Sequence, residues 1–205
     1  MLNFLRKSKP ASNDFTCMMY DMQPSECEGL VCRQDLPGWT TMLLRKQGEV
    51  WESVQADSLT PAQIAEAWEL AKAAALKASD DGEFTEFGDS GVVAYSGTHK
   101  DAAPGVLLHL RNFPELVGSV GTLVLQYDKF MVIFAIINDA AEVRESFKLL
   151  LKGFAAVASD DGAEGDAHPA NGWWFDSEGF EQWTMSEDRK ISPGPRLKAV
   201  LKSKS

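Results

Sequence analysis

Residues 130–137 read Phe-Met-Val-Ile-Phe-Ala-Ile-Ile and follow a candidate hairpin turn at Asp128-Lys129. A strand with one face in water alternates apolar and polar side chains, but this run has no polar position. We therefore expect a strand that is covered on both faces. The run is also far shorter than the roughly 20 apolar residues of a membrane-spanning helix, so we expect no transmembrane segment.

Two other segments have the apolar spacing of amphipathic helices, at residues 60–78 and 139–158. In the first, Thr60 precedes Pro61 and is followed three residues later by Gln63, which is close to a capping box. In the second, Glu142 stands in the capping-box position after Asp139. Each helix is expected to bury one face.

The order strand, strand, helix occurs twice. Candidate hairpins at 39–46 with 50–55 and at 122–127 with 130–137 each precede a helix, and both helices end in Ser-Asp-Asp-Gly, at 79–82 and 159–162. The two units share little other identity. A true duplication and the common organisation of α+β proteins both remain open explanations.

Further strands are predicted at 15–20, 30–33, 83–87, 92–96 and 106–110, with a turn at 113–116. The sequence thus predicts a single α+β domain over residues 14–186, with a mainly antiparallel sheet of about seven to nine strands. If both helices pack on one face of the sheet, the other face needs a cover. The N-terminal strands, the aromatic C-terminal segment and a second subunit are the alternatives, so a homodimer stays open.

Charge is distributed unevenly along the chain, whose net charge is −10. Residues 10–186 hold 28 acidic and 11 basic residues, a net charge of −17, while both ends are basic. Such a body repels nucleic acid and attracts a basic protein partner at low salt. Residues 1–13 and 187–205 are expected to be solvated basic segments, with contact to an anionic surface or to the acidic body as alternatives.

Cys17, Cys27 and Cys32 are an odd, sparse set, which is typical of reduced thiols and predicts a cytoplasmic protein without a disulfide framework. The spacing of Cys27 and Cys32 lacks the paired pattern of a structural zinc site. The first ten residues place their charges after a short apolar stretch, unlike a secretion signal. No cofactor motif is found.

Five aromatic residues gather near the C-terminal end of the domain, at Trp173, Trp174, Phe175, Phe180 and Trp183. Adjacent side chains on a strand point to opposite faces, so Trp173 and Trp174 cannot share one environment. Exposed tryptophan often anchors interfaces, which makes Trp173, Trp174, Phe175 and Trp183 candidate partner-binding residues. The alternative is that these rings cover the open face of the sheet.

Residues 160–168 contain four carboxylates and an imidazole within nine residues. Hard cations bind clusters of oxygen ligands, yet the spacing departs from the calcium loop, and a solvated acidic loop is the alternative. The candidate metal ligands are Asp160, Asp161, Glu164, Asp166 and His168.

Two other segments resemble catalytic features only locally. Gly88-Asp89-Ser90-Gly91 matches four residues around a trypsin-like nucleophile, but every histidine follows Ser90, which favours a turn. On the predicted strand 106–110, His109 faces away from Val106 and Leu108 and is expected to be a hydrogen-bonded structural group.

These observations predict a non-catalytic binding or regulatory accessory protein, of chaperone-like or toxin-neutralising type, whose acidic body attracts a basic partner. The alternative is a small enzyme or metal-dependent protein that uses the acidic loop with His168, or His109 in a cleft.

Overall fold

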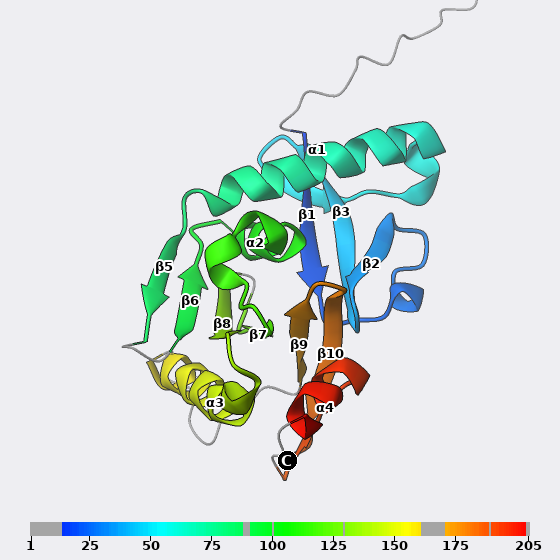
Figure 1. Ribbon diagram of the computed structural model, residues 1–205. Coiled ribbons are helices and arrows are strands. Elements are labelled where there is room, and N and C mark those ends of the chain that lie inside the picture. Colours follow the sequence, from blue (N-terminus) through cyan, green and yellow to red (C-terminus); the bar gives the residue numbers. More distant parts are fainter. Residues whose placement is uncertain are drawn as a thin grey trace, which may run out of the picture.

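The larger of two antiparallel sheets forms the centre of the protein (Figure 1). The structure is a computed structural model that describes residues 14–87, 91–99, 101–128, 130–160, 171–188 and 190–203. Seven strands pair in the order β11-β10-β9-β7-β8-β6-β5. They are β5 (Glu83–Glu86), β6 (Val92–Ser96), β7 (Gly121–Gln126), β8 (Met131–Ile137), β9 (Asn171–Asp176), β10 (Gly179–Met185) and β11 (Ile191–Ser192).

A smaller sheet is built from the N-terminal strands. The central strand, β3, pairs with β1 along one side and with both β2 and β4 along the other. Between β2 and β4, the main chain of Leu43 on β3 forms hydrogen bonds with Val31 and Val54. The strands are β1 (Phe15–Tyr20), β2 (Cys32–Leu36), β3 (Trp39–Gln47) and β4 (Val50–Ser53).

Four helices accompany the sheets in the described ranges, so the predicted α+β class is confirmed. They are α1 (Pro61–Ser79), α2 (Ala102–Leu108), α3 (Val143–Asp160) and α4 (Pro195–Lys202). Short 3₁₀ turns lie at η1 (Pro24–Glu26), η2 (Ala56–Ser58), η3 (Leu110–Asn112), η4 (Pro114–Leu116) and η5 (Ala140–Glu142). The described residues form eleven strands in two sheets, more than the sequence indicated. None of these helices combines the length and the apolar character needed to span a membrane.

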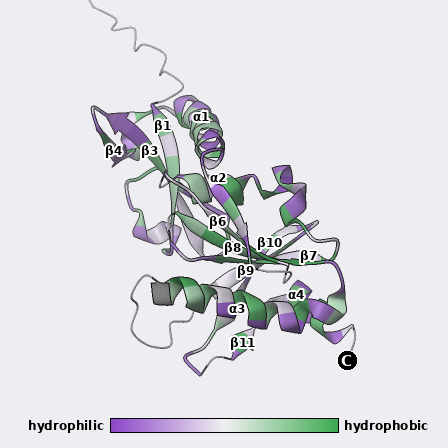
Figure 2. Ribbon diagram, turned by 90° about the vertical axis from the view of Figure 1, so that its left-hand side faces the viewer, coloured by the Kyte–Doolittle hydropathy of each residue, from purple (hydrophilic) through white to green (hydrophobic). Residues whose placement is uncertain are grey.

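β8 is the apolar run identified in the sequence, and it is buried on both faces as predicted. Ile133 and Ala135 share an apolar cluster with residues of α3. Val132 and Phe134, on the opposite face, share a second cluster with residues of α2. Figure 2 shows α3 and α4 on one side of this sheet and α2 on the other. The chain therefore covers both faces of β8 by itself.

The strand predicted at 106–110 is wrong, because this segment belongs to α2 and the following turn η3. Pro104 is tolerated in α2 since it occupies the first turn, where the amide groups lack a partner within the helix. Every residue from Ala102 to Leu107 is buried, so burial does not alternate as it does on a strand with one wet face. The apolar residues that are at most 1% exposed are Ala102, Ala103, Val106, Leu107 and Leu110.

α1 and α3 confirm the two predicted amphipathic helices. The Thr60 hydroxyl accepts the Gln63 amide and the Gln63 side chain accepts the Thr60 amide, which is the predicted capping box. Asp139 instead caps η5 by accepting the Ala141 amide at 2.9 Å, and α3 begins only at Val143. α1 packs on the small sheet and α3 on the large one, so the two strand-strand-helix units lie in different sheets.

α1 and α2 cross at very short range through Gly105. A Cβ atom at this position would lie 2.0 Å from the main-chain oxygen of Ala75. Ala75, the residue that Gly105 meets, is itself small and fully buried. Small residues thus allow α1, which covers the small sheet, to pack directly against α2, which covers the large one.

Gly105→Ala is expected to lower the free energy of unfolding by about 1–3 kcal/mol, because the added methyl group meets a main-chain atom that cannot move alone. Gly153→Ala is the matched control in α3, where a Cβ atom would lie 3.7 Å from its nearest neighbours. Its expected effect is neutral or stabilising by up to about 1 kcal/mol. Chemical denaturation of both variants measures the difference, and equal stabilities would contradict the proposed close crossing.

Residues 191–202 differ from the expected solvated tail, because they form β11 and α4 and bury Leu197 completely. The Glu181 carboxylate on β10 accepts hydrogen bonds from the amide of Arg196 at 2.9 Å and from that of Leu197 at 3.0 Å. These amides lie in the first turn of α4, where they have no partner within the helix. The Arg196 guanidinium also contacts the carboxylates of Asp176 and Glu181. This network fixes α4 to the large sheet.

Glu181→Ala is expected to destabilise the protein by about 1–3 kcal/mol, since it leaves two amides and a half-buried guanidinium without this partner. Glu178 lies 3.9 Å from the same guanidinium but is 76% exposed. Glu178→Ala is therefore expected to change stability by less than about 0.5 kcal/mol. Thermal and chemical unfolding compare the two, and a larger loss in Glu178→Ala would refute this assignment.

Candidate functional site

The four aromatic residues predicted to bind a partner lie in the core, each at most 4% exposed. Trp174 and Trp183 pack on the α3 face, whereas Trp173 and Phe175 pack on the α2 face. Trp173 also donates its indole N–H to the Pro37 oxygen at 2.9 Å, which ties the two sheets together. The structure accounts for the rings as core residues, and partner binding through them stays a prediction.

The predicted metal ligands fall mostly outside the described residues. Asp161, Glu164, Asp166 and His168 belong to that part, and for Asp160 only the main chain, at the end of α3, is described. Within the described ranges, no group of three or more histidine, cysteine, aspartate or glutamate side chains could hold a metal ion.

The structure gives no sign of reactivity at the other candidates that it describes, His109 and Cys17. His109 follows α2 rather than lying on a strand, and its Nε2 atom is 3.2 Å from the Lys72 oxygen of α1. Burial raises the pKa of the Cys17 thiol to about 12, so this thiol is a poor nucleophile at neutral pH. All three cysteines are free. Ser90 lies outside the described residues.

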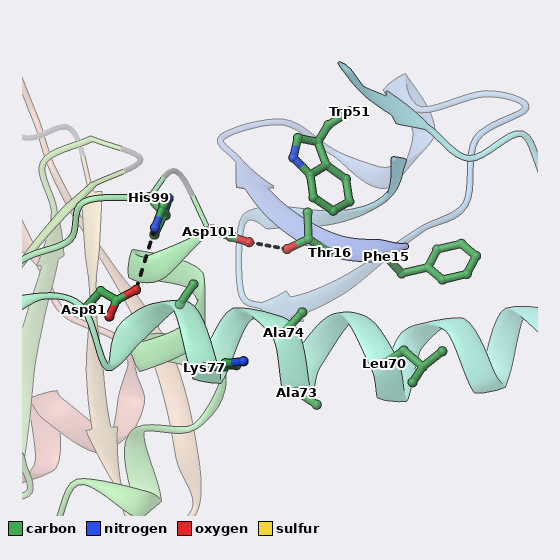
Figure 3. Close-up of a pocket in the computed structure, with 11 residues that line it drawn as sticks. Phe15, Thr16, Trp51, Leu70, Ala73, Ala74, Lys77, Asp81, His99 and Asp101 are labelled. Atoms are coloured by element: carbon green, nitrogen blue, oxygen red, sulfur yellow. Dashed lines mark hydrogen bonds and ion pairs between the residues drawn. The ribbon is translucent and has the colours of Figure 1, made fainter. Parts of the chain in front are cut away.

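A groove of about 520 Å³ runs between α1 and the strands β1 and β4 (Figure 3). Its walls are partly apolar, with small side chains from α1 on one side and aromatic rings from the small sheet on the other. Polar side chains gather at the end where α1 finishes. The lining residues are Phe15, Thr16, Trp51, Leu70, Ala73, Ala74, Lys77, Ala78, Asp81, His99 and Asp101.

Two polar pairs occupy the polar end of the groove. The buried Thr16 hydroxyl donates to the Asp101 carboxylate at 2.6 Å, and His99 Nε2 lies 3.7 Å from an Asp81 carboxylate oxygen. The side chains of His99 and Asp81 are 61% and 67% exposed. Water therefore reaches the second pair freely, and the arrangement suits contact with a charged ligand group better than protected proton transfer.

Negative charge dominates this end of the groove. We define the acidic corner as Asp80, Asp81 and Asp101. The buried Tyr95 hydroxyl donates to the Ser79 oxygen at 2.9 Å next to it. Burial, followed by the three carboxylates of the acidic corner, raises the pKa of Tyr95 to about 12. The corner thus produces a negative potential that a cationic ligand group would find favourable.

β5 starts two residues after the acidic corner and continues the negative charge. Its four residues, Glu83, Phe84, Thr85 and Glu86, are all exposed, and the strand lies at the end of the large sheet. Acidic corner and edge strand are therefore adjacent in the chain.

No single stretch of the sequence indicates this site, because its parts come from separate segments. The turn after α1 contributes Asp80 and Asp81, while the connection from β6 to α2 contributes His99 and Asp101. One local signal was present, since Asp80, Asp81, Glu83 and Glu86 place four acids in seven residues beside a predicted strand. Their approach to Asp101 requires α2, which was read as a strand.

Comparison with known protein families, curated proteins and solved structures finds no match. The functional argument therefore rests on the geometry and charge of the chain itself.

Replacing both Asp80 and Asp81 by asparagine is expected to lower the pKa of Tyr95, because their carboxylates disfavour the phenolate. NMR titration of labelled tyrosine measures this directly. The control, Glu49→Gln with Glu142→Gln, removes the same charge at exposed positions away from the corner. An equal pKa in the two double variants would refute the electrostatic role of the corner.

The raised pKa also sets a pH dependence. The folded state holds the Tyr95 proton more tightly than an unfolded chain, in which the tyrosine pKa is about 10. Protonated Tyr95 therefore makes its full contribution to the free energy of unfolding below about pH 10. This contribution is lost as the pH rises toward 12. We expect the free energy of unfolding to fall less steeply over this window in the Asp80→Asn, Asp81→Asn protein than in the control.

Proposed function

We propose that this protein is a non-catalytic accessory protein that binds a basic segment of a partner protein at the acidic corner. The observation that carries the proposal is the position of the corner at the end of a groove that also presents apolar side chains. Apolar side chains of a partner would enter the groove beside Trp51 and Leu70. Lysine or arginine side chains would meet Asp80, Asp81 and Asp101.

The size and charge of the region support this proposal. A volume of about 520 Å³ falls in the range of roughly 300–1,000 Å³ typical of ligand sites. The net charge of −17 over residues 10–186 would speed the encounter with a basic partner at low ionic strength. A chaperone-like or toxin-neutralising role uses the same chemistry, because both require a basic surface to be covered.

The alternative of a small enzyme has weaker support. His109 contacts the main chain of α1, and the histidine of the groove, His99, is open to water in its pair with Asp81. A nucleophile and its base need to lie within hydrogen-bonding reach of each other and of a substrate. The described residues that line the groove favour binding over chemistry.

A fluorescent peptide in which lysine and leucine alternate tests the proposed function. Binding is expected at about 50 mM salt and is expected to weaken strongly at about 200 mM. Asp80→Asn with Asp81→Asn should reduce the affinity by roughly 2- to 10-fold, because two favourable charge contacts are lost. Fluorescence anisotropy gives the dissociation constants.

The Glu49→Gln, Glu142→Gln protein is the matched control, since it has the same net charge and an unchanged corner. Its affinity is expected to stay close to that of the original protein. Equal weakening in both double variants would show that only overall charge matters, and absence of binding at low salt would refute the proposed function.

A further inference from the structure

β5 is the end strand of the large sheet. Among the residues that the structure describes, it pairs with β6 alone. The Phe87 amide donates to the Val92 oxygen, so the main-chain groups of alternate residues, Thr85 and Glu83, also face β6. The N–H and C=O groups of Phe84 and Glu86 therefore point outward from the sheet.

The side chains of β5 offer an apolar contact beside these outward groups. Phe84 is 43% exposed, and in the described part of the chain only Val50 is a more exposed large apolar residue. The Phe84 ring lies 5.0 Å from that of Tyr95 and 6.2 Å from that of Phe113. An added residue opposite Phe84 could thus pack on an aromatic surface that the protein already holds in place.

β5 has only part of the usual protection of an edge strand. It is short and carries two charged side chains, but it has no lysine, proline or bulge, which also discourage pairing with another chain, and it pairs with β6 in regular register. Its charged residues, Glu83 and Glu86, are both acidic and adjoin Asp80 and Asp81. This edge is suited to a strand that brings basic side chains.

We propose that the basic partner binds by adding an extended segment as an antiparallel strand to β5. This inference rests on the proposed function and specifies how the partner is held. The outward groups of Phe84 and Glu86 would form the main-chain hydrogen bonds of the new pair, as in other cases of strand addition.

The register specifies the segment. An antiparallel strand meets Glu86, Thr85, Phe84 and Glu83 in that order, so the matching sequence is basic, any residue, apolar, basic. Pairing between two copies of β5 through the outward groups would centre on Thr85, with Glu86 of one copy opposite Phe84 and diagonal to Glu86 of the other. Like charges at neighbouring positions disfavour that arrangement, so charge complementarity selects a basic partner over a second copy.

Peptides that contain Lys-Thr-Val-Lys test the pairing. In the proposed register the valine lies opposite Phe84 with its N–H toward β5, and the threonine lies opposite Thr85 with its N–H directed away. Methylation of the valine nitrogen should weaken binding by about 3- to 10-fold or more, while methylation of the threonine nitrogen should have little effect. Equal effects of the two methyl groups would overturn strand addition.

A pair of protein variants gives a second, independent readout. Glu86→Pro removes an outward N–H and the charge, whereas Glu86→Gln removes the charge alone, and neither touches a hydrogen bond to β6. We expect weaker peptide binding by Glu86→Pro than by Glu86→Gln, with both proteins folded by circular dichroism. Equal binding by the two would overturn the inference.

These outcomes separate the inference from the proposed function. If peptide binding depends on salt but is unchanged by nitrogen methylation and by Glu86→Pro, the proposed function is supported and strand addition is refuted. Loss of all peptide binding would refute both. Dimerisation in sedimentation experiments that Glu86→Pro abolishes would identify a second copy as the occupant of β5 and would also overturn the inference.

Discussion

The burial of β8 on both faces is the constraint on which the rest of the structure depends. A strand without a polar position must lie between two apolar layers. α3 supplies one layer, because its amphipathic sequence follows β8 directly. α2 supplies the other, and it also packs against α1 through Gly105. Contacts therefore run from β8 to α3 on one face, and on the other face through α2 to α1 and the small sheet.

The candidate site is a consequence of that packing. Because α2 lies against α1, the connection from β6 carries Asp101 to the buried hydroxyl of Thr16 on β1. The same packing leaves Asp80 and Asp81 at the end of α1, where β5 begins. Carboxylates from two distant segments thus act together on Tyr95. The acidic corner thus depends on the elements that cover β8, and the edge strand β5 follows it directly in the chain.

The sequence predicted those parts of the fold whose signals are local. The capping residues Thr60 and Gln63, the helical spacing in α1 and α3, and the apolar run of β8 each reflect neighbours along the chain. α2 was misread because Val106, Leu108 and Leu110 alternate as in a strand and Pro104-Gly105 argues against a helix. Tertiary contact with Ala75 and with the β8 face decides otherwise. The division into two sheets and the acidic corner depend on such contacts, so no local pattern could specify them.

Amide hydrogen exchange along β5 tests the central claim most directly. On addition of a peptide containing Lys-Thr-Val-Lys, the outward amides of Phe84 and Glu86 should become protected, while the amide of Thr85, already bonded to β6, should change little. Such alternating protection is specific to an added strand. Protection confined to other parts of the surface, or none at Phe84 and Glu86 when peptide is bound, would contradict the account.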